Sequence, residues 1–176
     1  GVRPIDIPLK AISQFGVKIK IKKGYVNATA QEGLVGSEIR FSKISVGATE
    51  NSILAACLAK GTTTIKNCAI EPEIKDLTNF LKTAGAKIKW IGKRTLKIEG
   101  VKTLKSITYS IMNDRIEAGT FCVAACLNGG KLKIKNFEPK IINTEINLLK
   151  KIGAKIKTTK NTIQIKGPKK IKSLDF

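Results

Sequence analysis

The chain has 176 residues, 42% of them hydrophobic, and a formal net charge of +20. This length supports a buried core in one or two domains. No run approaches the ~18 apolar residues of a membrane-spanning helix, and no charged-then-apolar leader opens the sequence, so we expect a soluble cytoplasmic protein without a membrane segment. Because the chain opens on Gly1 and closes on Phe176 without an evident final element, we also expect a segment of a longer protein.

The positive charge raises the alternative of a non-catalytic, basic nucleic-acid-binding module. The sequence holds 29 lysines and 4 arginines, and the lysines are spread through the chain rather than clustered beside aromatic residues. Recognition of bases and phosphates relies strongly on the forked guanidinium group of arginine. The pattern favours solvated lysine-rich faces, so we expect no nucleic-acid partner and keep the binding module as the alternative.

An internal repeat with a step of about 69 residues organises the chain. The segment at residues 15–20 returns at 84–89 and again at 152–157, and the segment at 54–58 returns at 123–127. Two unrelated blocks that share one offset indicate copies of one supersecondary unit. A difference between equivalent positions of the copies then points to function.

The hydrophobic pattern predicts alternating helices and strands along the chain. In order, these are a helix that ends at Gly16; strands at 17–21, 25–30 and 37–41; a helix at 48–60; a strand from Thr62; a helix with its apolar face at Leu77, Phe80, Leu81 and Ala84 that ends at Gly85; strands at 86–91, 95–99 and 107–110; a helix at 115–127; a strand from Lys131; and a helix with Ile142, Ile146 and Leu149 that ends at Gly153.

The polarity of these elements predicts how the layers stack. The strands alternate isoleucine with lysine, so one face of each sheet should meet the core and the other should meet water. The helices at 48–60 and 115–127 are apolar all round, and such helices are usually buried on every side. We therefore expect an α/β fold of the inside-out kind, with helices buried and sheets outside.

The segments that lead into these two apolar helices differ in charge. Asp114 and Glu117 have the spacing of a capping box, which is an ordinary structural helix start. At the equivalent place in the earlier copy, Ser45 follows Lys43 and precedes Gly47. A helix N-terminus with free amides, a glycine and a lysine suits a phosphate group, although Ser45 as a simple cap is the alternative.

The opening stretch at residues 3–8 has two prolines, Pro4 and Pro8. We expect these prolines to hold the stretch extended and to leave Arg3 and Asp6 available to a partner. A linker held by an Arg3–Asp6 ion pair is equally consistent with these residues.

The four cysteines are predicted to be buried small hydrophobic residues rather than functional thiols. They are Cys57, Cys68, Cys122 and Cys126, and the chain has no histidine. Zinc-ligand spacing is absent, and a disulfide framework is unexpected in a cytoplasmic chain of this size. We predict no metal site.

Four ordered segments closely resemble signatures of the bacterial UDP-N-acetylglucosamine enolpyruvyl transferase family. They lie at residues 3–6, 45–51, 71–77 and 114–121. The resemblance implies inside-out α/β barrel domains of repeated β-α-β-α-β-β units. It also implies transfer of the enolpyruvyl group from phosphoenolpyruvate to the 3-hydroxyl of UDP-N-acetylglucosamine, the first committed step of peptidoglycan synthesis, without a metal or an organic cofactor.

By matching position, the resemblance also implies domains and site residues. Residues 1–112 would belong to the sugar-nucleotide-binding domain, and 113–176 would begin the second, catalytic domain. The implied substrate-binding residues are Arg3, Pro4, Ile5, Asp6, Ile7, Lys43, Ile44, Ser45, Val46 and Gly47. Asp114 and Arg115 match the family's crossover between domains.

The same matching implies that no catalytic residue of the family lies within this chain. The family's reactive cysteine would precede Gly1, and none of the four cysteines occupies its position. We therefore expect the segment to need the missing remainder of its own enzyme and to show no turnover alone. The sister transferase that acts on shikimate 3-phosphate shares the architecture, and we expect it to lack the signature at residues 45–51.

Overall fold

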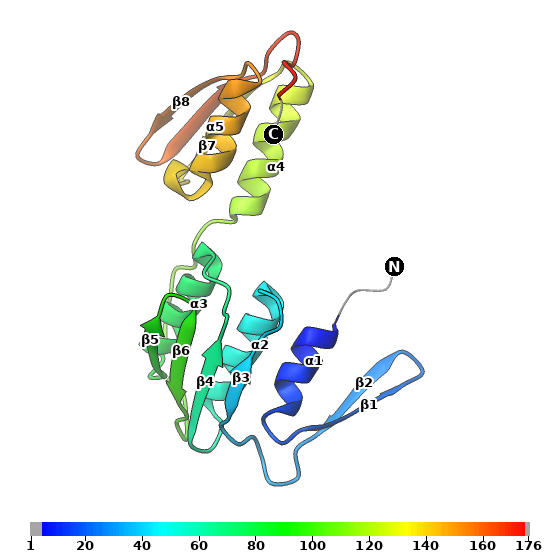
Figure 1. The fold of residues 1–176 in the computed structure, drawn as a ribbon. Helices are drawn as coiled ribbons and strands as arrows, with labels where there is room; N and C mark the ends of the chain where they lie inside the picture. Colours follow the sequence, from blue (N-terminus) through cyan, green and yellow to red (C-terminus); the bar gives the residue numbers. More distant parts are fainter. Residues whose placement is uncertain (1–4, 175–176) are drawn as a thin grey trace. The chain divides into compact units, whose positions relative to one another are not determined.

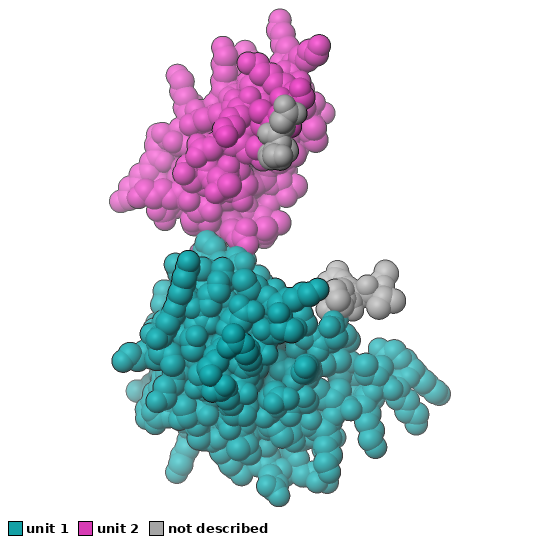
Figure 2. Space-filling model, in the orientation of Figure 1, with its two compact units in different colours: residues 1–111 teal, residues 112–176 magenta. Residues whose placement is uncertain are grey.

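The computed structural model describes residues 5–174, and the chain divides into two compact units, residues 1–111 and 112–176 (Figure 2). The first unit contains α1 (Asp6–Ser13), β1 (Lys18–Lys22), β2 (Tyr25–Thr29), β3 (Glu38–Arg40), α2 (Val46–Cys57), β4 (Thr62–Lys66), α3 (Pro72–Thr83), β5 (Lys87–Gly92) and β6 (Thr95–Glu99). The second contains α4 (Arg115–Leu127), β7 (Lys131–Lys135), the 3-10 helix η1 (Pro139–Ile142), α5 (Asn143–Lys151), β8 (Lys155–Thr159) and β9 (Thr162–Lys166) (Figure 1).

The sheet topology repeats in the same way as the sequence. In the first unit the strand order is β3-β4-β6-β5, with β3 parallel to β4 and the other neighbours antiparallel. The second unit has the order β7-β9-β8, which is equivalent to β4-β6-β5. The β1–β2 hairpin follows α1 as β5–β6 follows α3. The repeated unit is therefore β-α-β-α-β-β, and residues 38–99 contain one whole copy.

The sheets have one apolar and one polar face, as the strand pattern predicts. On β4 and β6 the buried residues Ile65, Leu96 and Ile98 alternate with more exposed polar residues. In Figure 1, α2 lies beside the four-stranded sheet, and it contacts β4, β6, α1 and α3. The core of the first unit forms where the apolar sheet face meets these helices.

The described residues do not by themselves bury the two apolar helices on every side, although the sequence pattern predicts such burial. Leu54 and Leu58 on α2 are 50% and 53% exposed, and Phe121 and Leu127 on α4 are 53% and 68% exposed. Each helix packs on the sheet of its own unit and against neighbouring helices, α2 against α1 and α3, and α4 against α5 and η1, and no described element covers the exposed stripe. The described residues form open sheets rather than a closed barrel.

The strand predicted at residues 107–110 is not a strand in the structure. Instead, the Tyr109 hydroxyl donates to Asp76 Oδ1 at 2.9 Å, and the Tyr109 ring packs edge-on against Phe80 with centroids 5.5 Å apart. The hydrogen bond to Asp76 raises the pKa of Tyr109. This segment is held by side-chain contacts with α3 rather than by a strand partner.

The cysteines fit the prediction of buried hydrophobic residues. All four are free and buried, and burial raises the pKa of Cys57 and of Cys68 to about 11. Thiols with raised pKa values are poor nucleophiles at neutral pH. Among residues 5–174, no helix is long and apolar enough to cross a membrane.

At equivalent places in the two units, a glycine lets the chain after the last strand approach the end of a helix closely. A Cβ atom built on Gly100 would lie 1.7 Å from the Ala59 carbonyl oxygen, and one built on Gly167 would lie 2.2 Å from the Ala125 carbonyl oxygen. The Gly100 and Gly167 amides donate to the carbonyls of Gly61 and Gly130 at 2.9 and 2.8 Å. Only glycine allows these backbones to approach so closely.

We predict that Gly100→Ala and Gly167→Ala each lower the free energy of unfolding by about 1–3 kcal/mol or more, because the new methyl group overlaps a backbone carbonyl oxygen. Denaturant titration of each variant measures this change. Gly119→Ala is the matched control, because nothing lies within 4 Å of its Cβ position in α4. It should gain up to about 1 kcal/mol through helix propensity. Equal effects at Gly100 and Gly119 would contradict the packing argument.

Candidate functional site

The N-terminus of α2 is capped by Ser45, as the sequence predicts. Ser45 has an extended backbone, and its Oγ accepts the Ala48 amide at 3.2 Å. The first helical residues, Val46 and Gly47, come before the intrahelical hydrogen-bond ladder begins, so their amides have no acceptor within α2. Both residues are half-buried, and open space surrounds the Cβ position of Gly47. A ligand can therefore reach this helix end.

Along the chain, residues 43–49 at this helix end are all positive or neutral. The first turn of α2 contains no acidic residue. Lys43 and Ile44, immediately upstream, are exposed. The positive end of the helix dipole and a nearby lysine attract an anion.

The equivalent helix end in the second unit is acidic. Asp114 caps α4, and its Oδ1 accepts the Ile116 amide at 2.7 Å and the Glu117 amide at 3.2 Å. Glu117 adds a second carboxylate to the first turn. The repeated unit thus has a helix N-terminus without acidic residues at α2 and an acidic helix N-terminus at α4, as the comparison of the repeats predicts.

The opening segment is partly helical rather than extended. Arg3 and Pro4 lie outside the described residues, but α1 begins at Asp6, and the Leu9 amide donates to the Ile5 carbonyl at 3.0 Å. The prediction of an extended stretch is therefore wrong from Asp6 to Pro8. Pro8 occupies the third position of the helix, where its missing amide would have had no intrahelical partner.

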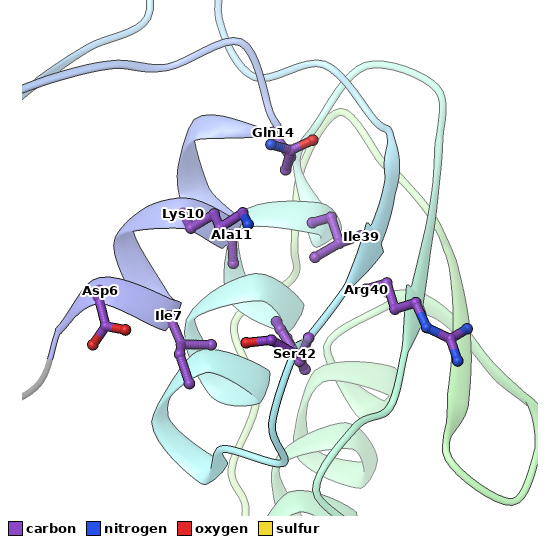
Figure 3. A pocket seen from close by; sticks show the side chains of 9 residues that line it. Asp6, Ile7, Lys10, Ala11, Gln14, Ile39, Arg40 and Ser42 are labelled. Atoms are coloured by element: carbon purple, nitrogen blue, oxygen red, sulfur yellow. The ribbon is translucent and has the colours of Figure 1, made fainter.

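A pocket of about 280 Å³ lies between α1 and the segment that leads into α2 (Figure 3). Asp6 and Ile7 line it from α1, and residues 39–42 line it from β3 and the residues that follow. Asp6 and Ile7, from one predicted substrate-binding segment, therefore lie close to residues 39–42, which immediately precede the other. The pocket lining stops at Ser42, so Lys43–Gly47 adjoin the pocket along the chain but do not form its wall.

Two cationic pocket residues were missed by the sequence reasoning. Lys10 and Arg40 line the pocket from α1 and β3. Lys10 follows Asp6 by four residues, the spacing that places side chains on one helix face. The sequence reasoning did not use this helical spacing, because it expected the opening stretch to be extended.

The carboxyl group of Glu50 in α2 is in an unfavourable environment. Partial burial raises its pKa, and the carboxylate of Glu73 raises it further. A carboxyl group whose pKa is raised by folding favours the folded state most at pH values below its pKa in the unfolded chain. This contribution is lost as the pH rises through the folded pKa.

We therefore predict that Glu50→Gln raises the melting temperature at neutral pH and that the gain disappears near pH ~4, where the unfolded carboxyl is largely protonated. Thermal denaturation at both pH values measures the effect. Glu32→Gln is the control, because it removes the same charge at an exposed position. Similar shifts for both variants at neutral pH would contradict a specific cost at Glu50.

Comparison with known proteins defines the family. A family model described as EPSP synthase (3-phosphoshikimate 1-carboxyvinyltransferase) matches residues 1–176. The chain therefore belongs to this family of enolpyruvyl transferases. Among the described residues, no group of three or more histidine, cysteine, aspartate or glutamate side chains is placed to hold a metal ion.

Curated relatives confirm the resemblance to UDP-N-acetylglucosamine enolpyruvyl (1-carboxyvinyl) transferases. The UDP-N-acetylglucosamine 1-carboxyvinyltransferase of Pelagibacter ubique is 62% identical over 176 residues, which is 100% of this chain and 42% of that protein. The enzyme of the same name from Ruthia magnifica subsp. Calyptogena magnifica is 50% identical over 165 residues, 94% of this chain and 39% of that protein. The chain thus spans about two fifths of the length of these relatives.

Solved structures share the fold. The enolpyruvyl transferase NikO from Streptomyces tendae superposes with a TM-score of 0.78 at 23% identity, covering 95% of this chain and 43% of that chain. An EPSP synthase from Acinetobacter baumannii superposes with a TM-score of 0.65 at 21% identity, covering 98% of this chain and 41% of that chain.

Proposed function

We propose that this chain forms the sugar-nucleotide side of a cytoplasmic enolpyruvyl transferase. The reaction moves the enolpyruvyl group of phosphoenolpyruvate to the 3-hydroxyl of UDP-N-acetylglucosamine and releases phosphate, the first committed step of peptidoglycan synthesis. The observation that carries this proposal is 62% identity, over the whole chain, to a UDP-N-acetylglucosamine 1-carboxyvinyltransferase.

In this proposal the residues of the chain bind and orient the sugar nucleotide. The Val46 and Gly47 amides and the Lys43 ammonium group would hold the diphosphate, since each offers positive charge at the acid-free end of α2. Asp6 and Ile7 would line the uridine end beside the pocket in Figure 3. On sequence grounds, the neighbouring residues Arg3, Pro4 and Ile5 complete the set, together with Ile44 and Ser45 immediately before α2.

The proposal also assigns the two units to domains. Residues 1–112 would belong to the sugar-nucleotide domain, and residues 113–176 would begin the catalytic domain. Further repeat units of the whole protein would cover the exposed stripes that include Leu54 on α2 and Phe121 on α4, which would close each domain into an inside-out barrel. Turnover would need that remainder, so we expect none from this chain alone.

We expect Lys43→Ala, made in a complete enzyme that contains this chain, to raise KM for UDP-N-acetylglucosamine about tenfold while kcat changes little, because a ground-state phosphate contact is lost. Arg3→Ala should behave in the same way. Steady-state kinetics with varied sugar nucleotide measure both constants. Lys89→Ala removes an exposed charge from β5 and serves as the control. An unchanged KM for both test variants would overturn the site assignment.

Binding measurements on the same complete enzyme distinguish this proposal from two alternatives. UDP-N-acetylglucosamine should raise the melting temperature, because a ligand that binds only the folded state stabilises it. A shift with shikimate 3-phosphate alone would instead identify the sister transferase, which the description of the family model names. Binding to arbitrary duplex DNA with a steep salt dependence would identify the basic nucleic-acid module.

A further inference from the structure

We propose that a second pocket, between α3 and β5, binds a small anion that carries a planar ring, of the nucleoside monophosphate kind. It shares no lining residue with the pocket beside α1. Its volume is about 470 Å³, which is in the range of small-molecule sites. The proposal does not rest on the proposed function.

Positively charged residues line this pocket. Lys75 and Lys82 lie two turns apart on α3, and Lys93 lies across from them in the turn after β5. The described residues that line the pocket include these three lysines and no carboxylate. Three ammonium groups around one hollow favour a ligand with a phosphate or similar anionic group.

The pocket lining also has an apolar part with an aromatic ring. It contains Trp90, the single tryptophan of the chain, together with Ile70. Trp90 is half-buried and packs against the hydrophobic core, so its indole is held in place while part of it stays accessible. A fixed aromatic surface of this kind favours stacking with a planar ring.

The strand geometry at Trp90 is irregular. Trp90 pairs with Leu96, but the register between β5 and β6 shifts between Trp90 and Gly92. A β-bulge changes the direction of side chains at the end of a strand, and bulges are common beside binding sites. The bulge lies where both Trp90 and Gly92 line the pocket.

The other copies of the repeat lack this combination of residues. Aligned on Gly16, Gly85 and Gly153, the position of Trp90 is held by Ile21 in the first copy and by Thr158 in the third. The equivalents of the three lysines are Asp6, Ser13 and Gly24 in the first copy and Asn143, Lys150 and Asn161 in the third. The scaffold therefore does not require these residues, and their combination in the middle copy points to a ligand.

Trp90 provides a direct test, because its fluorescence reports only on this pocket. We expect adenosine 5′-monophosphate to quench Trp90 fluorescence saturably and with salt-dependent affinity. Adenosine, which lacks the charge, should bind about tenfold more weakly or worse. Inorganic phosphate should displace the nucleotide, because it competes for the lysines.

Variants separate a built site from general attraction to a basic protein. The triple variant Lys75→Gln, Lys82→Gln and Lys93→Gln should weaken nucleotide binding about tenfold or more. The control triple Lys20→Gln, Lys22→Gln and Lys23→Gln removes the same charge from exposed positions on the β1–β2 hairpin. It should change the affinity by less than about twofold. Trp90→Ile, followed by calorimetry, should lower nucleotide affinity and leave phosphate affinity unchanged.

Two outcomes would overturn the proposal. Absence of saturable quenching by the nucleotide would exclude a site at Trp90. Equal weakening by the two triple variants would show that binding follows net charge alone. Circular dichroism of each variant verifies that it is folded, so that a loss of binding reports on the pocket.

Discussion

A buried hydroxyl group fixes the helix end on which the proposed site depends. Thr49 is fully buried in α2, and its Oγ1 donates to the Ser45 carbonyl at 2.7 Å and accepts the Ala69 amide at 3.0 Å. These bonds tie the start of α2 to the chain that follows β4. In α4 the equivalent position, by the repeat offset, is Ala118, which has no such hydroxyl. The first turn of α2 is thereby held by interior contacts and leaves its outer amides open.

The duplication explains why one scaffold has two different helix ends. Both helices begin with an oxygen cap, but Ser45 is neutral, whereas Asp114 is charged and is followed by Glu117. A neutral cap leaves the positive end of the helix dipole available to a ligand, whereas a carboxylate neutralises it. The overall positive charge is not concentrated at this helix end. On the sheet of the second unit, for example, Lys131, Lys166 and Lys155 lie opposite one another on neighbouring strands and are exposed. Solvent must screen the repulsion between these like charges.

Much of the fold followed from residue patterns, because local periodicity and glycine positions determine most elements here. Residues 95–99 and 115–127 were predicted with the same bounds as β6 and α4. Tertiary context decided the failures. Residues 107–110 have strand character, but Tyr109 packs on α3 instead. Pro8 suggested extended chain, but it lies where a helix tolerates proline. The apolar pattern of α2 and α4 predicted complete burial, but the helices and strands of each unit leave one stripe of each helix exposed.

The candidate site was predictable in part. The contrast between Ser45 and Asp114 was visible because the copies could be aligned, and the structure has the predicted cap at each. The pocket wall could not be predicted, since Lys10 and Arg40 come from separate elements and line one pocket only in the folded chain. The Trp90 pocket was equally unpredictable, because its residues come together only when α3 packs against β5, the bulged strand that follows it in the chain.

The most direct measurement transplants the acidic cap of α4 onto α2. Ser45→Asp in the complete enzyme keeps a good capping residue, so the melting temperature should stay close to that of the parent. If α2 holds the diphosphate, calorimetry should show that Kd for UDP-N-acetylglucosamine rises about tenfold or more, because the new carboxylate repels the phosphate groups. An unchanged Kd in a variant of unchanged stability would contradict the account.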